Sequence, residues 1–354
     1  MFKDDGLWPR SWAATLCNRY QEVIMERLLE VDQLKTYYFT DRGIVKAVDG
    51  FSFSVERGQC LGIVGESGCG KSQTALSIMG LISKPQGRIV GGKILYRDKN
   101  ARTTDLTTLA PTGDEYRAIR GKEIAMIFQE PMSSLSPVYT IGDQIVEALT
   151  EHTALSKKDA ARRAVELLKT VGIPAAEERV HDYPHQLSGG MCQRAMIAMA
   201  LSCEPRLLIA DEPTTALDVT IQLQILRLLK ELQKRLSMGL VMITHDLGVI
   251  AEIADDVIVM YLGKVVEKGP VRKILREPKH PYTQGLLQSR PSGAAGKVRL
   301  NPIKGVVPSA IDPPFGCPFS TRCPKAFDQC GLPPPFAVWG EDHEAACWLY
   351  ENLM

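Results

Sequence analysis

A glycine-rich stretch in the first quarter of the chain carries the residue types that bind phosphate. The apolar run 60–64 predicts a buried strand, and the pattern G-x-x-x-x-G-K-S follows it directly, before an apolar segment that favours a helix. Glycines let the backbone turn tightly and point N–H groups inward, and the helix adds the positive end of its dipole. Lys71 can neutralise outer phosphates and Ser72 can bind Mg²⁺. The pattern therefore predicts a nucleotide site formed by Gly65, Glu66, Ser67, Gly68, Cys69, Gly70, Lys71 and Ser72.

Cys69 lies inside this stretch and allows two interpretations. It is favoured as a small residue that fits the loop. The alternative is a reactive thiol whose pKa is lowered by the helix terminus and by Lys71.

A second short apolar run, 207–210, ends in two carboxylates, Asp211 and Glu212. An acid at the end of a strand can hold the shell of Mg²⁺, and its neighbour can polarise an attacking water. The alternative is an acidic helix cap, which is common after strands. Upstream, the turn Ser188–Gly189–Gly190 precedes a helix-favouring segment and predicts a second anion-binding nest.

Taken in order, these motifs resemble those of the ATP-binding cassette (ABC) ATPases over nearly all of residues 25–354. The resemblance implies roles for residues outside the first loop: Phe39, or alternatively Tyr38, as the aromatic that stacks on adenine; Gln129 as a residue that senses Mg²⁺ and faces the permease; Ser188, Gly189 and Gly190 as the signature turn; Asp211 and Glu212 as the Mg²⁺ and catalytic acids; Asp218 in the loop after them; His245 near the γ-phosphate.

Three further stretches, "FQEPMSSLSP", "HPYTQGLL" and "IKGVVPS", look like the ATPase subunits of oligopeptide, dipeptide and nickel importers. Met191 after the signature turn is typical of one of the two ATPase types in such importers. The resemblance implies ATP and Mg²⁺, a second and different ATPase subunit, two integral-membrane permease subunits, and an extracytoplasmic solute-binding protein. It also implies a peripheral place on the cytoplasmic face of the membrane. Peptide is the expected solute, nickel or another small solute is the alternative, and a soluble ABC ATPase that does not transport is a third interpretation.

Composition supports a globular chain and argues against some partners. The chain has 354 residues, of which 45% are hydrophobic, and this is enough for a sizeable core. A net charge of +1 gives no basic field for nucleic acid, so no nucleic-acid partner is expected. The sequence has neither a secretion signal nor the roughly 18 consecutive apolar residues of a membrane span, so we expect a cytosolic chain.

The elements that must position these residues alternate between strand and helix patterns, which predicts an α/β fold with a largely parallel sheet. The expected architecture is the P-loop NTPase core of the ABC type with an N-terminal β-subdomain, an inserted helical subdomain at about 132–188, and a small Cys/Pro-rich C-terminal segment. Ser156 and Asp159 predict the start of a helix whose face is formed by Ala164, Leu167, Leu168 and Val171. We expect a cassette at 25–285 and the C-terminal segment at 286–354. Residues 1–24 match nothing and are expected to be a misassigned start or an extension.

Four cysteines cluster in the C-terminal segment: Cys317, Cys323, Cys330 and Cys347. Their spacings are C-x5-C, C-x6-C and C-x16-C, which differ from the usual zinc-ribbon spacing, and disulfides are disfavoured in the cytosol. Four thiolates can hold a [4Fe–4S] cluster or zinc, and four buried cysteines without metal are the alternative. Resemblance to dipeptide-importer subunits implies the [4Fe–4S] cluster, and we expect it to fasten a segment with little core of its own.

Overall fold

The computed structural model describes residues 26–215, 217–289, 302–340 and 342–353. The stretch 1–24, named above, lies outside the described residues.

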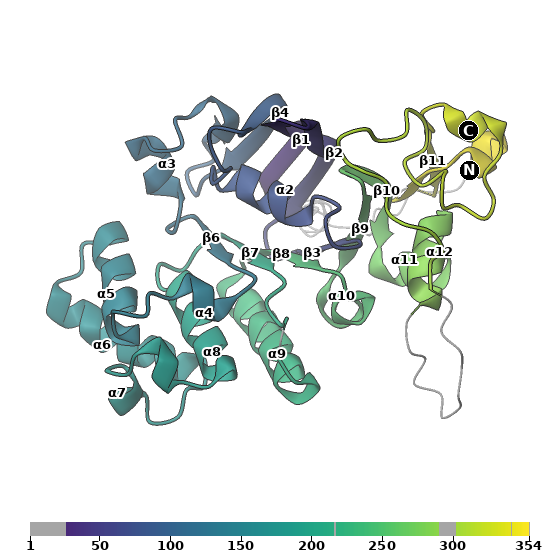
Figure 1. Ribbon diagram of the computed structural model, residues 1–354. Coiled ribbons are helices and arrows are strands. Elements are labelled where there is room, and N and C mark those ends of the chain that lie inside the picture. Colours follow the sequence, from purple (N-terminus) through teal and green to yellow (C-terminus); the bar gives the residue numbers. More distant parts are fainter. Residues whose placement is uncertain (1–25, 216, 290–301, 341, 354) are drawn as a thin grey trace, which may run out of the picture.

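The larger sheet of the described chain contains eight strands in the order β11-β12-β10-β9-β3-β8-β7-β6 (Figure 1). The strands from β9 to β6 run parallel, so the expected parallel sheet is confirmed, whereas β10, β12 and β11 extend it with antiparallel pairs. The bounds are β3 Cys60–Val64, β6 Ile124–Ile127, β7 Leu207–Asp211, β8 Gly239–Thr244, β9 Asp256–Tyr261, β10 Lys264–Pro270, β11 Phe336–Trp339 and β12 His343–Ala346.

Both faces of the central strands are covered, which is why they are nearly continuous apolar runs. In β3, Cys60 and Val64 pack into one hydrophobic core, whereas Leu61 and Ile63 pack into the other. This alternation places the end of the strand, where the glycine-rich loop begins, between two packed layers.

A second, antiparallel sheet covers one of these faces, in the order β2-β1-β4-β5. The predicted β character is confirmed, and the alternation in "FSFSVE" buries Phe51, Phe53 and Val55. The bounds are β1 Arg27–Thr40, β2 Gly43–Glu56, β4 Gly87–Arg97 and β5 Thr103–Asp105.

Helices form the remaining layers. Helix α2 lies in the core between the two sheets, while α8, α9 and α10 pack on the opposite face of the large sheet (Figure 1). The α-helix bounds are α2 Lys71–Ile78, α3 Asp114–Ile119, α4 Pro131–Ser134, α5 Ile141–His152, α6 Lys157–Thr170, α7 Ala176–Arg179, α8 Gly189–Ala200, α9 Val219–Leu236, α10 Leu247–Ile253, α11 Val271–Arg276 and α12 Pro281–Gln288. The 3-10 helices are η1 Leu106–Thr108, η2 Pro184–Gln186, η3 Asp328–Gly331 and η4 Trp348–Leu353.

The predicted helical subdomain is confirmed as the group α4 to α7, which leads into α8 (Figure 1). Ser156 caps α6, because its hydroxyl accepts a hydrogen bond from the Asp159 backbone N–H at 3.2 Å. The side chains expected on the inner face, including Ala164 and Leu168, are buried. The helix therefore packs by an amphipathic face, as the sequence predicts.

The C-terminal segment corrects one expectation, because it does not lack a core. Strand β12 pairs with β10 of the large sheet, and Phe319, Cys317 and Cys330 are buried in the same core as α8 to α10. The segment thus extends the main sheet instead of forming a separately fastened tail.

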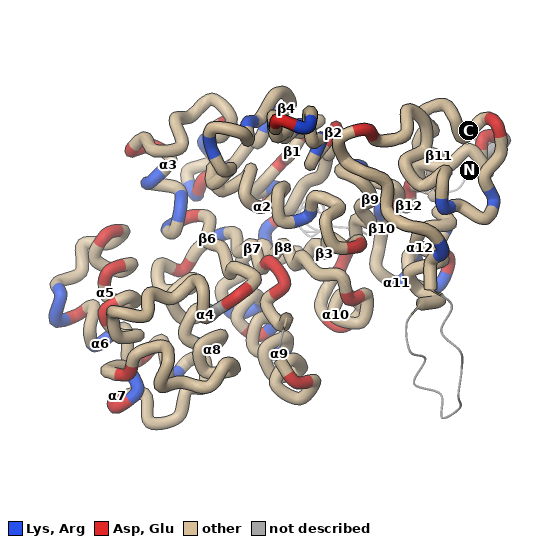
Figure 2. Tube along the Cα trace, in the orientation of Figure 1, with Lys and Arg blue, Asp and Glu red and all other residues tan. Residues whose placement is uncertain are grey.

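Basic and acidic residues are interspersed along the described elements (Figure 2). Among the described residues, no helix combines the length and apolarity needed to cross a bilayer.

Candidate nucleotide site

The glycine-rich loop forms the turn between β3 and α2. Gly68 and Gly70 have φ of +79° and +105°, a backbone conformation that side chains other than glycine rarely adopt. A Cβ at Gly70 would lie 2.0 Å from Ala47 O, and one at Gly65 would lie 2.2 Å from Met260 O. The predicted need for glycine is therefore confirmed at both ends of the loop.

Lys71, the first residue of α2, is buried inside this loop. Its Nζ donates hydrogen bonds to Gly65 O at 2.8 Å and Glu66 O at 3.1 Å. The ammonium group thus places a positive charge inside the loop, which is suited to binding an anion.

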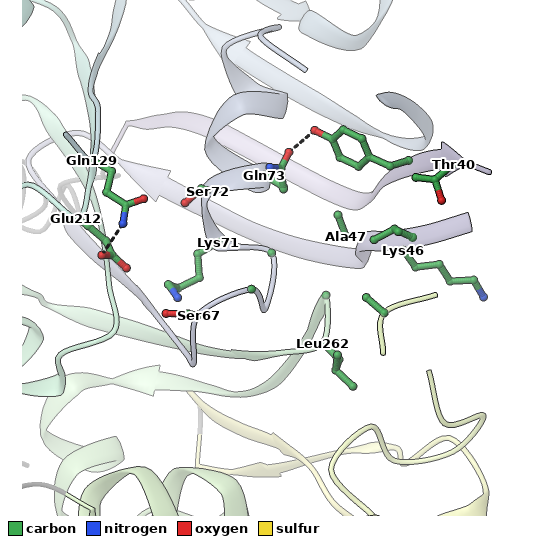
Figure 3. A pocket seen from close by; sticks show the side chains of 16 residues that line it. Thr40, Lys46, Ala47, Ser67, Lys71, Ser72, Gln73, Gln129, Glu212 and Leu262 are labelled. Carbon is green, nitrogen blue, oxygen red and sulfur yellow. Dashed lines mark hydrogen bonds between the residues drawn. The ribbon is translucent and has the colours of Figure 1, made fainter. Parts of the chain in front are cut away.

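A pocket of about 540 Å³ opens beside the loop. Of the residues predicted for the site, it is lined by Ser67, Gly68, Gly70, Lys71, Ser72, Gln129 and Glu212. Figure 3 shows Lys71, Ser72 and Glu212 at one end of the pocket and Lys46 and Leu262 at the other. Apart from the alternative Tyr38, the lining of this second end was not predicted from the sequence. It includes Thr40, Val45, Gly263 and Ala310, which, with Lys46 and Leu262, come from three separate segments without a motif.

Asp211 lies at the end of β7 and is buried next to Ser72 and Lys71. Burial raises the pKa of Asp211 above its ordinary value, partly opposed by a hydrogen bond with Ser72 and the charge of Lys71. Among the described side chains, its Oδ1 is one of the buried oxygens without a hydrogen-bond partner. A buried carboxylate oxygen without a partner, beside a hydroxyl, fits the hard oxygen ligands that Mg²⁺ requires.

Glu212 follows Asp211 and is the centre of a hydrogen-bond network. Its Oε2 accepts hydrogen bonds from Gln129 Nε2 at 3.1 Å and Thr215 Oγ1 at 2.9 Å, and its Oε1 accepts one from His245 Nδ1 at 3.1 Å. Glu212 has φ of +47°, a strained conformation for a residue other than glycine. Thr215 is a member of the network that the sequence analysis missed.

The electrostatics of this network keep the carboxylate of Glu212 charged. Burial alone would raise its pKa, but hydrogen bonds from His245 and Thr215 and the charges of His245 and Lys71 lower the pKa below its ordinary value. An ionised carboxylate held by three donors at the edge of a phosphate pocket can orient water or accept its proton.

The two aromatic candidates for adenine stacking differ in position. Tyr38 lines the pocket, and its hydroxyl donates a hydrogen bond to Gln73. Phe39 is not among the pocket-lining residues, because it faces the other side of β1, where the Arg88 guanidinium lies 4.5 Å from its ring centroid. The geometry thus favours the alternative, Tyr38, over Phe39.

Cys69 is buried against Gly65 and belongs to the core between the two sheets. Burial raises the pKa of its thiol and outweighs the lowering effect of Lys71. The hypothesis of an activated thiol is therefore wrong, and the interpretation as a small loop residue remains.

The other predicted ATP-site residues lie outside this pocket. Ser188 caps α8, since its hydroxyl accepts from Met191 N at 3.3 Å, and Asp218 caps α9 by accepting from Ile221 N at 3.0 Å. A Cβ at Gly190 would lie 3.1 Å from Ile221 Cγ2, so the turn 188–190 and the start of α9 are neighbours. Both are N-termini of helices, and both carry partial positive charge.

The four cysteines of the C-terminal segment come close together. Burial and the neighbouring thiols raise the pKa values of Cys317 and Cys347 to about 11 each. Within the described ranges, however, no group of three or more Cys, His, Asp or Glu side chains is arranged to hold a metal ion.

The sequence matches two models of known protein families and is similar to several known transport proteins. A model described as ABC transporter matches residues 48–215, and one described as the oligopeptide/dipeptide transporter C-terminal region matches residues 266–330. The chain is 52% identical over 329 residues to the oligopeptide transport ATP-binding protein AppD of Bacillus subtilis, covering 93% of this chain and 98% of the relative. It is 54% identical over 303 residues to the dipeptide transport ATP-binding protein DppD of Haemophilus influenzae, covering 86% and 89%.

Solved structures give the same fold. A dimeric, post-hydrolysis state of the ATP-binding cassette MJ0796 bound to ADP and Pi has a TM-score of 0.60 and 28% identity, and the match covers 69% of this chain and 99% of that one. Part of the cbiONQ transporter complex, cbiO1 from Clostridium perfringens, has a TM-score of 0.58 and 27% identity over 71% of this chain and 92% of that one.

Proposed function

The chain belongs to the ABC ATPases of the oligopeptide and dipeptide transporter family, and we propose that it hydrolyses ATP to energise peptide import across the cytoplasmic membrane. The observation that carries this proposal is the carboxylate of Glu212, held by three donors beside a phosphate loop. Relatives whose names specify peptide transport support peptide as the solute.

The phosphate end of the site is assigned to four residues. Lys71 binds the outer phosphates of ATP, and the loop N–H groups bind their oxygens. Ser72, Asp211 and Gln129 would hold Mg²⁺, and the ion would neutralise phosphate charge there. The buried Oδ1 of Asp211 supports this assignment.

Hydrolysis then depends on positioning. Glu212 orients the attacking water and accepts its proton, while His245 stabilises charge on the γ-phosphate. In the structure, Glu212 accepts hydrogen bonds from Gln129 and His245, which supports a role for all three side chains in hydrolysis. Tyr38 stacks on adenine at the other end of the pocket.

A second ATPase subunit completes the site. Ser188, Gly189, Gly190 and Asp218 lie outside the chain's own pocket, which supports their use on ATP held by a partner subunit. ABC importer ATPase subunits work with membrane permeases, and we place this chain peripherally on the cytoplasmic face, with two permease subunits and an extracytoplasmic solute-binding protein. The proposed division is a cassette at 25–285 and a C-terminal segment at 286–354.

The test is peptide uptake and ATP hydrolysis in vesicles that contain the assembled transporter. Glu212→Gln should bind ATP normally and lose about 10²- to 10³-fold in turnover, because a group that acts in the transition state is removed. Glu252→Gln, on the exposed side of α10, is the matched control and should behave as native. Near-native turnover of Glu212→Gln would contradict the assignment, and stimulation by nickel instead of peptide would favour the alternative solute.

The iron–sulfur cluster stays a separate prediction. The donor chemistry of four thiols fits it, but the described side chains are not arranged around a metal. Iron, acid-labile sulfide and zinc measured on anaerobically purified protein decide the matter. About four irons and four sulfides per chain would support the cluster. Stoichiometric zinc would replace it, and absence of all three would leave four structural cysteines.

A further inference from the structure

Glu66 places a carboxylate inside the phosphate-binding loop. It is the second residue of the segment 65–72 and the acidic residue of that segment. A free negative charge there would oppose binding of a polyphosphate. Something must therefore compensate for it.

Arg322, from the cysteine-rich part of the C-terminal segment, compensates for this charge. Its Nη1 lies 2.6 Å from Glu66 Oε2 and its Nη2 3.1 Å from Glu66 Oε1, which is the two-pronged geometry of a strong ion pair. The Arg322 side chain is 4% exposed, whereas that of Glu66 is 27% exposed. The pair joins residues 256 positions apart.

Arg322 is itself held firmly. Its Nε donates to Lys304 O at 3.2 Å and its Nη1 donates to Tyr261 Oη at 3.2 Å. The guanidinium carbon also lies 5.9 Å from the ring centroid of Phe319. A guanidinium fixed by so many contacts cannot easily leave Glu66.

The backbone of Glu66 is fixed as well. Its N–H donates to the hydroxyl of Tyr282 at 2.8 Å, and its carbonyl accepts from Lys71 Nζ at 3.1 Å. The ring of Tyr282 packs on Tyr261 and Phe319, with centroids 4.7 and 5.3 Å apart. Glu66 therefore links Arg322 to Lys71, the lysine proposed to bind phosphate. Its carboxylate pairs with Arg322, and its carbonyl accepts a hydrogen bond from Lys71.

We propose that Arg322 is a positioning residue of the ATP site, which neutralises the Glu66 carboxylate and fixes the loop that presents Lys71. The proposal rests on the proposed function, since it takes 65–72 as the triphosphate site. It assigns the C-terminal segment a role in nucleotide affinity. Ala310, which lines the far end of the pocket and accepts a hydrogen bond from Lys46 N at 3.1 Å, brings the same segment to the site a second time.

The test compares affinities for ATP and ADP in full-length variants. Arg322→Met leaves the Glu66 charge uncompensated and should weaken ATP binding about tenfold, with a smaller loss for ADP, since the repulsion scales with ligand charge. Arg322→Lys keeps the charge without the fork and should lie between native and Arg322→Met. In the double variant with Glu66→Gln, affinity should return to within about twofold of native, because the uncompensated charge is gone.

Arg206→Met is the matched control, because it breaks another partly buried pair, Arg206 with Glu26, at the opposite end of β7 from Asp211. It should leave both affinities at the native value. If Arg322→Met fails to fold, Arg322→Lys remains decisive: it loses the two-pronged contact with Glu66 and should still bind ATP more weakly than native, with a smaller loss for ADP.

Three results would overturn the proposal: native ATP affinity in Arg322→Met, equal losses for ATP and ADP, or no rescue by Glu66→Gln. Lys71→Ala separates this failure from failure of the site itself. If Lys71→Ala also binds ATP as native does, the nucleotide does not bind at 65–72 and the proposed site is wrong.

Discussion

The carboxylate of Glu212 shows how side-chain contacts decide the charge of a single residue. Burial favours its neutral form, but His245 and Thr215 donate hydrogen bonds to the ionised form and the pKa falls below the ordinary value. The resulting contribution to folding stability is fully present above the unfolded-state pKa and is lost as the pH falls through the folded-state pKa. These hydrogen bonds therefore favour the ionised form of Glu212, which is the form that can accept a proton.

Thr215→Val should move the acid side of the pH–rate profile to higher pH. The substitution removes one of the hydrogen bonds that lower the pKa of Glu212, so the carboxylate is protonated earlier as the pH falls. At neutral pH the rate should fall by no more than about tenfold, because the base itself remains. Steady-state ATP hydrolysis between acid and neutral pH measures the shift.

Thr150→Val is the control for that experiment, because the Thr150 hydroxyl bonds only within its own helix, to Val146 O and Glu147 O. It should keep the native profile. An unchanged acid limb in Thr215→Val would mean that Thr215 does not set the ionisation of Glu212.

Among single residues, motif spacing predicted the phosphate loop, whereas the resemblance put Phe39 ahead of Tyr38 for the contact with adenine. Lys71, Ser72 and the acids follow fixed offsets from strand ends, so a motif places them without knowledge of packing. The choice between Tyr38 and Phe39 depends on which face of β1 each occupies. The pairing of β1 with β2 shifts register between Thr36 and Tyr37, so simple alternation along the sequence cannot decide the face.

At the scale of elements, helix caps serve both folding and the proposed site. Thr140 caps α5 through a reciprocal pair with Asp143, and Ser188 caps α8. In the proposed transporter only Ser188 also faces ATP, across the interface with the second ATPase subunit. A comparison of the Thr140 cap with the Ser188 cap therefore separates the contribution of a cap to folding stability from its contribution to ATP hydrolysis.

Ser188→Ala and Thr140→Ala should each lower the free energy of unfolding by about 1 kcal/mol, since each loses an N-cap. Only Ser188→Ala should in addition lower ATP hydrolysis by the assembled transporter, by about tenfold, because one charge-assisted hydrogen bond to ATP is lost. Urea unfolding and hydrolysis rates measure the two effects. Equal hydrolysis by both variants would argue against contact between Ser188 and ATP.

The elements themselves were predictable where their signals are local. Helix α6 begins at its cap and ends near Gly172, and β3 and β8 are short apolar runs between polar segments. Strands β11 and β12 have four residues each, and β12 pairs with a strand more than 70 positions earlier in the chain. A pairing of that kind depends on the assembled core and leaves no periodic signal in the sequence.

In the described chain, packing is continuous from the phosphate loop to the cysteine-rich segment. Phe319 contacts Tyr261 at the end of β9 and Tyr282 in α12, with ring centroids 5.4 and 5.3 Å apart. Buried Glu267 of β10 accepts hydrogen bonds from the backbone of Lys279 and the ring of His343. The C-terminal segment therefore contributes to stability through packing that does not depend on a metal.

Phe319→Ala tests whether the C-terminal segment and the rest of the chain share one core. Phe315→Ala, the same substitution four residues away, is the control. Phe319 is 1% exposed and Phe315 is 80% exposed. Phe319→Ala should lower the free energy of unfolding of the whole chain by about 3–5 kcal/mol, because a buried ring is replaced by a cavity. Phe315→Ala should change it by less than about 0.5 kcal/mol, as surface substitutions usually do.

Urea unfolding followed by both far-UV circular dichroism and tryptophan fluorescence should report one shared transition in each variant. Were Phe319→Ala to melt the C-terminal segment alone, with the ATP-binding part unfolding at the native urea concentration, the segment would be an independent unit. A shared shift would instead mean that the core beneath Arg322 and the core of the ATP-binding part unfold together.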